Sequence, residues 1–448
     1  MRRALLLLLV TGTGGGMIFS KMAARLSAFA THFVGFIILP AQLPGDPMDI
    51  VQDLTSDPIG TLRTLDWSTF RALIRQIWTS QKLTLPHDAT LERLHETRTK
   101  YLSRGWAHCP LTTVDGLTLD AFWKQPATTQ IAPRFIVFVG GNAQKYEDWL
   151  PYFQLYADES EFGFLCFNFR GVARSEGVIN HKGDMLNDVR AAVDFLVERG
   201  VQPHHILLHG FSLGGAIAAL FLAEPGAPRA AITSDRSFRS YCHAAFGLMR
   251  GFNAAVGDER PPLSDRSAGP SLAEVGLVWW VRAHCARALV TLLLLVRALV
   301  GTFAYAALKA TDWELNALEA WRKIPGKKVL VYNVADNIVA YGAASLHAAL
   351  VAEDGTGSDD GESSGGATSA KGHAGGAAGG GAFANATVVE VTLRYAQGWA
   401  LHDFPLSLDL DAWYAMIAAE RAALGVAEDG GQEMPAGGGG LVYGATGL

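Results

Sequence analysis

The stretch LLHGFSLGGAIA, residues 207–218, decides the fold, because it places one serine between two glycines, behind an apolar run and ahead of small residues. A Gly-x-Ser-x-Gly sequence of this kind is typical of a sharp turn from a β-strand into an α-helix, where larger flanking side chains would clash. The serine then stands at the positive end of the helix dipole, which favours developing negative charge. We therefore predict Ser212 as a catalytic nucleophile. A structural serine in an ordinary tight turn is the alternative.

The segments around this turn alternate between apolar runs and helical patterns. Six runs are predicted as strands: RFIVFVGG (134–141), FGFLCFNF (162–169), HHILLHG (204–210), RAAITSD (229–235), KKVLVYNVAD (327–336) and ATVVEVTLRY (386–395). Apolar runs without polar alternation are buried on both faces, so they predict an α/β fold whose mostly parallel sheet has helices on both sides. Before them, LTTVDGLTLDAFW (111–123) alternates around Asp115-Gly116, which predicts a hairpin.

A serine hydroxyl needs a base to remove its proton and an acid to orient that base. In an α/β protein with this turn, the order along the chain is serine, acid, histidine. Asp336 ends a predicted strand and His402 follows the last one, so we predict Ser212, Asp336 and His402 as a catalytic triad. Two alternatives stay open: Asp336 as the N-cap of the following helix, and Asp235, at the end of its own strand, as the acid.

Acyl transfer also needs N–H donors for the oxyanion of the tetrahedral intermediate, each contributing on the order of 3 kcal/mol. We expect one donor from the backbone of Leu213, directly after the nucleophile. The second is expected from the glycine-containing loop 140–143, where the backbone can approach the reacting carbon closely, with the Asn142 N–H as the candidate.

Several stretches together resemble the α/β-hydrolase superfamily, and most closely its CHLPS-type branch of serine hydrolases from intracellular bacteria: VGGNAQKYE, FNFRGVARSEG, HGFSLGG, SDRSF, TDWELN and ADNIV. The similarity covers about residues 105–415. The resemblance implies the α/β-hydrolase fold and a metal-independent ester, thioester or amide hydrolase, and it assigns Gly141 together with Asn142 to the oxyanion loop. The sequence departs from the pattern at Gly140, where many relatives carry a histidine, and in a glycine-rich insert.

The composition along the chain predicts how it is organised. We expect an apolar targeting or anchor segment (1–45), a helical lead-in (46–104), the first part of the core (105–235), a helical cap or lid insertion (236–320), the second part of the core (321–422) interrupted by a disordered Gly/Ala-rich loop (353–385), and a disordered tail (423–448).

Charge and cysteine spacing exclude several classes of function. The formal net charge is −6 and no long basic run appears, which does not favour nucleic-acid binding. The four cysteines lie far apart, with no CxxC pair and no spacing suited to zinc. We therefore expect buried thiols and no zinc site. The resemblance implies no metal and no cofactor, and the apolar N-terminus and cap favour a small-molecule or lipid acyl substrate.

Two apolar segments make a membrane surface a candidate partner. Residues 1–45 carry basic but no acidic side chains, and their two apolar runs are each shorter than the ~20 residues of a spanning helix. A cleaved signal, an organelle-targeting segment and a retained anchor remain open, so the expected location is membrane-associated or organellar. Residues 277–308 predict an amphipathic helix with Arg282, Arg287 and Arg297 on one side, either packed on the core or lying as a lid against lipid.

The resulting functional prediction is a lipase-like serine esterase that acts on a lipid or another hydrophobic acyl ester. A thioesterase or a serine peptidase would use the same triad. A catalytically silent, membrane-associated binding protein with a hydrolase fold is the alternative from another class.

Overall fold

The structure is a computed structural model that describes residues 88–126, 133–142, 144–250, 313–336, 338–356, 383–392 and 405–426, together with residues 302, 305, 306, 308, 309 and 402. The predicted N-terminal segment lies outside the described residues, as do most of the predicted helical lead-in, of the cap, of the Gly/Ala-rich loop and of the tail.

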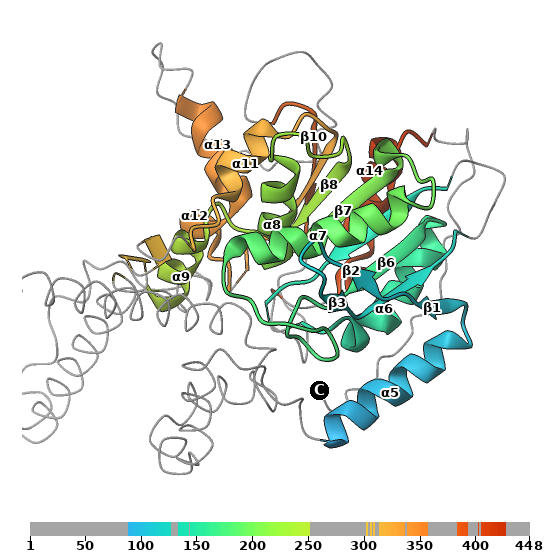
Figure 1. Cartoon of the computed structure of the whole chain (residues 1–448). Helices are drawn as coiled ribbons and strands as arrows, with labels where there is room; N and C mark the ends of the chain where they lie inside the picture. Colours follow the sequence, from blue (N-terminus) through green and yellow to red (C-terminus); the bar gives the residue numbers. More distant parts are fainter. Residues whose placement is uncertain are drawn as a thin grey trace, which may run out of the picture.

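An eight-stranded sheet forms the centre of the fold, in the order β1-β4-β6-β5-β7-β8-β9-β10 (Figure 1). Its strands are β1 (Trp106–His108), β4 (Ala121–Lys124), β5 (Phe135–Val139), β6 (Gly163–Phe167), β7 (Ile206–Phe211), β8 (Ala231–Asp235), β9 (Lys328–Tyr332) and β10 (Ala386–Glu390). The strands from β6 through β10 in this order pair in parallel, and β4 is antiparallel to both β1 and β6. Each of the six predicted strands is found, and the mostly parallel α/β sheet is confirmed.

The central strand β5 is apolar at every position because both of its faces are buried. Along β5, Phe135, Val137 and Val139 belong to one hydrophobic core, whereas Ile136 and Phe138 belong to the other. Successive side chains of a strand point to opposite faces, so a strand between two cores needs an uninterrupted apolar sequence.

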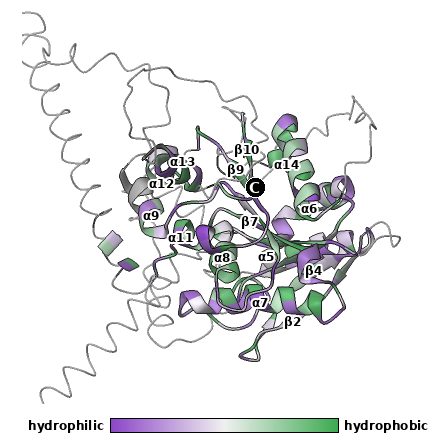
Figure 2. Ribbon diagram, turned by 90° about the horizontal axis from the view of Figure 1, so that it is seen from above, coloured by the Kyte–Doolittle hydropathy of each residue, from purple (hydrophilic) through white to green (hydrophobic). Residues whose placement is uncertain are grey.

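Helices cover both faces of the sheet. The first core is completed by α7 (Lys182–Val197), α8 (Leu213–Leu222), α11 (Ala317–Lys323) and α13 (Leu346–Thr356), and the second by α6 (Tyr146–Ser160) and α14 (Leu410–Ala423). The view from above shows α6 and α14 on the opposite side of the sheet from α7 and α8 (Figure 2). The remaining helices are α5 (Asp88–Leu102), α9 (Tyr241–Arg250), α12 (Tyr341–Ala344) and the short 3-10 turns η2 (Pro203–His205) and η4 (Leu406–Leu408). Three of the predicted segment boundaries fall inside helices, since α11 crosses residue 320, α13 continues into the segment 353–385 and α14 ends at Ala423, inside the predicted tail.

The predicted hairpin is confirmed, but it is shorter than its alternating sequence. β2 (Leu111–Thr112) and β3 (Thr118–Leu119) pair antiparallel around a turn in which Gly116 has φ 82°. The next residue, Asp120, is buried and accepts two hydrogen bonds from Arg98, at 2.9 and 3.0 Å. This polar anchor ends the hairpin, and the chain then enters β4 of the main sheet.

The described cysteines Cys109, Cys166 and Cys242 are buried free thiols, as predicted. Among the helices in the described part of the chain, none is long and apolar enough to span a bilayer.

Candidate active site

Ser212 occupies the sharp turn between β7 and α8. Its backbone has φ 51° and ψ −113°, a conformation that L-residues rarely adopt and that turns the side chain out of the strand. The flanking glycines are required by space, since a Cβ on Gly210 would lie 2.4 Å from the Gly214 carbonyl oxygen and a Cβ on Gly214 would lie 1.9 Å from the Val139 carbonyl oxygen. The Ser237 hydroxyl donates to the Ser212 carbonyl at 2.7 Å, which holds the turn from the neighbouring loop.

His402 lies directly beside this serine. Its Nε2 is 2.8 Å from Ser212 Oγ, although 190 residues separate the two along the chain. Its Nδ1 is 2.7 Å from Asp336 Oδ2. A carboxylate only accepts hydrogen bonds, so Nδ1 carries the proton and Nε2 is left to accept the hydrogen bond from the serine hydroxyl. All three side chains are buried.

Asp336 serves two contacts through its two oxygens. Oδ2 faces His402, whereas Oδ1 accepts the backbone N–H groups of Ile338 at 2.9 Å and Val339 at 2.8 Å. The cap-like role considered as an alternative is therefore present together with the contact to the histidine. The Asp336 carboxylate therefore fixes the turn after β9. The same two hydrogen bonds from the turn fix the orientation of the carboxylate toward His402.

Asp235, the alternative acid, is engaged elsewhere. Its oxygens pair with the guanidinium of Arg236 at 2.8 and 3.0 Å, and one of them lies 3.7 Å from Nε2 of His209. Burial disfavours the charged carboxylate, but the Arg236 charge and the contacts from His209 and Arg236 outweigh it, so the pKa of Asp235 lies well below its ordinary value. Asp336 is thus the carboxylate in contact with His402.

The three residues predicted to hold the oxyanion lie in different surroundings. Leu213 follows Ser212 as the first residue of α8 and is buried. The Gly141 N–H donates to the side-chain oxygen of Gln144 at 2.7 Å, so it is already engaged. Asn142 is the next residue of the same loop and is exposed. Gln144 was not predicted from the sequence, because nothing local distinguishes it from a solvent-facing loop residue.

A buried polar network lies behind the nucleophile turn and was also not predicted. His209 on β7 is fully buried, with Nδ1 2.9 Å from Glu420 Oε1 on α14 and 3.0 Å from the hydroxyl of Tyr156 on α6. The Tyr156 hydroxyl also donates to Glu420 Oε2. Burial opposes the charge on His209, but the contacts with Asp235 and Glu420 outweigh it and raise the pKa of the imidazole to about 9.

The ring of Phe211 connects this network to His402. The Arg236 guanidinium lies 4.8 Å from its centroid, and the His402 ring lies 5.2 Å from it. Within the part of the chain that is described, no group of three or more His, Cys, Asp or Glu side chains is arranged to hold a metal ion.

Comparisons with known proteins agree with this architecture. Residues 136–360, half of the chain, match the family model for the alpha/beta hydrolase family. The protein YfhR of Escherichia coli O157:H7 is 30% identical over 152 residues, which cover 31% of this chain and 50% of that protein. A multifunctional-autoprocessing repeats-in-toxin protein of Vibrio vulnificus is 27% identical over 121 residues, which cover 26% of this chain and 2% of the toxin. The chain thus spans half or less of the length of these two curated relatives.

Solved structures with a similar arrangement include an alpha-beta hydrolase from Vibrio vulnificus, at a TM-score of 0.45 and 16% identity over 76% of this chain and 88% of that chain. The Pyrococcus furiosus esterase Pf2001 is similar at a TM-score of 0.34 and 16% identity, over 53% of this chain and 73% of that chain. The resemblance to the CHLPS-type branch stays a prediction. With a family match over half its length and the sheet described above, the chain belongs to the alpha/beta hydrolase family.

Proposed function

We propose that this protein is a serine hydrolase that cleaves a carboxylic ester through an acyl-enzyme intermediate. One observation carries the proposal: two short hydrogen bonds link Ser212 Oγ to His402 Nε2 and His402 Nδ1 to Asp336 Oδ2, at 2.8 and 2.7 Å. This chain of hydrogen bonds lets a neutral hydroxyl act as a nucleophile. The histidine that takes the hydroxyl proton is already oriented, and the aspartate stabilises the positive charge that the histidine then carries.

The reaction has two matching halves. Ser212 Oγ attacks the ester carbonyl while His402 Nε2 takes the hydroxyl proton, and His402 returns that proton to the alcohol as the tetrahedral intermediate collapses. Water then attacks the acyl-serine, with His402 again as base, and the acid leaves as Ser212 regains its proton. Asp336 keeps the imidazole in the required tautomer and stabilises the imidazolium in both halves.

The oxyanion is held by the backbone N–H groups of Leu213 and Asn142. The Gly141 N–H is not assigned to it, since it donates to Gln144 at 2.7 Å. Each donor aimed at the developing charge stabilises the transition state by about 3 kcal/mol.

The favoured substrates are lipid or other hydrophobic acyl esters, because 49% of the residues are hydrophobic and two apolar segments flank or interrupt the core. Thioesters and amides react by the same chemistry. Association with a membrane surface remains part of this proposal and rests on the sequence alone.

Covalent labelling with a fluorophosphonate probe tests the nucleophile. We expect labelling of the wild type, full loss in Ser212→Ala, and labelling slowed by several orders of magnitude in His402→Ala. The exposed serine variant Ser103→Ala is the matched control and should label like the wild type. A folded wild type that does not react would overturn the proposal in favour of a silent binding protein.

The acid is tested by comparing Asp336→Asn with Asp235→Asn, with thermal unfolding measured alongside. Asp336→Asn should slow labelling in a protein that unfolds near the wild-type temperature. Asp235→Asn should mainly lower the unfolding temperature, because it leaves the buried Arg236 charge without its partner. Substrate class is then read from hydrolysis rates on p-nitrophenyl esters of increasing chain length, matched thioesters and matched anilides.

A further inference from the structure

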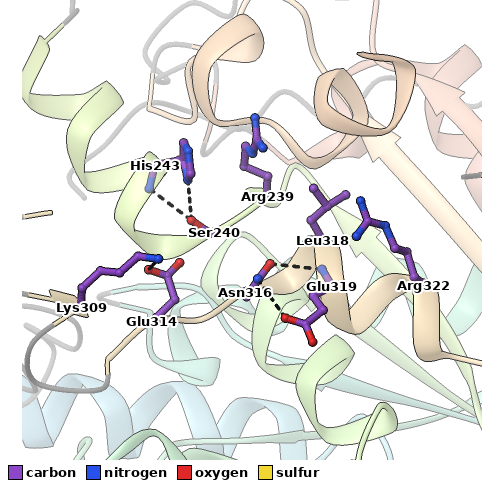
Figure 3. Close-up of a pocket in the computed structure, with 9 residues that line it drawn as sticks. All are labelled: Arg239, Ser240, His243, Lys309, Glu314, Asn316, Leu318, Glu319 and Arg322. Atoms are coloured by element: carbon purple, nitrogen blue, oxygen red, sulfur yellow. Dashed lines mark hydrogen bonds and ion pairs between the residues drawn. The ribbon is translucent and has the colours of Figure 1, made fainter. Parts of the chain in front are cut away.

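A pocket of about 280 Å³ lies between the start of α9 and the start of α11. Its ionisable residues come from three segments, with Arg239 and His243 on the first, Lys309 and Glu314 on the second, and Glu319 and Arg322 on α11 (Figure 3). None of the lining residues belongs to the Ser212, His402 and Asp336 group. Its volume is near the lower end of pockets that bind small molecules.

Most of the charges around the pocket are already matched. Arg322 on α11 pairs with Glu353, and Glu319 pairs with Lys323 at 2.6 Å. Lys309 Nζ lies 3.9 Å from Glu314 Oε2, an ion-pair distance that is too long for a hydrogen bond. Burial and the nearby Arg239 and Lys309 charges lower the pKa of His243, which favours its neutral imidazole.

Two polar groups of the pocket are left without a hydrogen-bond partner in the described part of the chain. The Arg239 guanidinium makes no side-chain hydrogen bond or ion pair there, whereas its backbone is fixed by the bonds Arg239 N–H to Ala344 O (2.7 Å) and Leu318 N–H to Arg239 O (2.9 Å). Glu314 Oε2 is buried and receives no hydrogen bond. Among the described residues, the pocket therefore offers a cationic donor without a partner, Arg239, on a backbone that is held in place. It also offers an anionic acceptor, Glu314, whose carboxylate has only the long ion pair with Lys309 and the neighbouring Cys242 thiol as contacts.

We propose that this pocket binds a small carboxylate that also carries a hydrogen-bond donor, such as an ammonium or hydroxyl group. The planar guanidinium of Arg239 matches a carboxylate through two parallel hydrogen bonds. The ligand's donor group hydrogen-bonds to Glu314 Oε2. The lining holds three cationic side chains, Arg239, Lys309 and Arg322, and two carboxylates, so it carries one excess positive charge, which favours a single carboxylate over a dianion such as phosphate.

The test is isothermal titration calorimetry of the full chain with three probes of matched length: 4-aminobutyrate, butyrate and butylamine. We expect 4-aminobutyrate to bind at least about tenfold more tightly than butyrate, and butylamine not to bind. Arg239→Met should weaken both carboxylates by about tenfold or more. Glu314→Gln should reduce the affinity for 4-aminobutyrate to that for butyrate.

The matched control is Arg93→Met, which removes an exposed arginine outside the pocket and should leave binding unchanged. Thermal unfolding and fluorophosphonate labelling of every variant separate a loss of this site from a loss of folding or of the proposed catalytic function. The proposal is overturned if Arg239→Met, folded and labelled like the wild type, binds 4-aminobutyrate equally well. It is also overturned if the folded wild type binds none of the probes at concentrations up to about 10 mM, the weak end of small-ligand affinity.

Discussion

At the scale of single residues, the nucleophile turn depends on the absence of a side chain at Gly214. In Gly214→Ala the new methyl would lie 1.9 Å from the Val139 carbonyl oxygen, so either the turn or β5 has to move. We expect a loss of about 3 kcal/mol or more in the free energy of unfolding, measured by urea titration. Gly342→Ala is the control, because a methyl group there would have no atom within 4 Å, and the same substitution should leave stability unchanged or raise it by up to about 1 kcal/mol. Equal stability of the two variants would contradict this account of the turn.

Gln144 is a second residue whose effect is local. Its side-chain oxygen accepts the Gly141 N–H at 2.7 Å and so orders the loop that carries Asn142. In Gln144→Leu this bond is lost, and we expect kcat for an activated ester to fall about tenfold with little change in KM, because the loop acts on the oxyanion rather than on the bound substrate. Asn142→Ala keeps its backbone N–H and should retain nearly full activity. A higher kcat in Gln144→Leu would instead mean that the freed Gly141 N–H is the better donor.

At the scale of elements, the sequence predicts those features of the structure that depend on neighbouring residues in the chain. The apolar runs identify the six strands because burial on both faces favours apolar residues at most positions, and Ser212 is identified by the glycines that its turn needs. The engagement of Gly141 by Gln144 has no such signature, since any loop residue with an acceptor could make that bond. The contact of His209 with Glu420 spans 211 residues and joins β7 to α14, and no local pattern announces such a pairing.

The turn after β9 is an element in which structure and proposed catalysis share one side chain. Asp336→Asn keeps an oxygen for the Ile338 and Val339 N–H groups, whereas Asp336→Ala removes both this cap and the partner of His402. We expect kcat to fall about 10⁴-fold in both variants. In Asp336→Asn the histidine takes the wrong tautomer, and in Asp336→Ala its imidazole is no longer oriented. Only Asp336→Ala should also lose about 1 kcal/mol of stability, as after removal of a helix or turn cap. Circular-dichroism melts beside ester hydrolysis separate the two effects, and a stable, inactive Ala variant would show that the cap contributes nothing.

At the scale of the whole molecule, the His209 network joins both parts of the core and makes stability depend on pH. The pKa of His209 is raised from 6.5 to about 9 in the folded protein, so its contribution is fully present below pH 6.5 and is lost as pH rises through 9. We expect the free energy of unfolding to fall between pH 6.5 and about 8, a window below the ordinary pKa of about 8.5 of a cysteine thiol. Glu420→Gln removes one of the two charges that hold the histidine protonated, so it should lower stability at pH 6.5 and flatten this slope. Asp411→Asn, an exposed change on the same helix, should keep the wild-type slope. Denaturant titrations across the window decide the matter: an unchanged slope in Glu420→Gln would mean that His209 is not the group whose proton stabilises the fold.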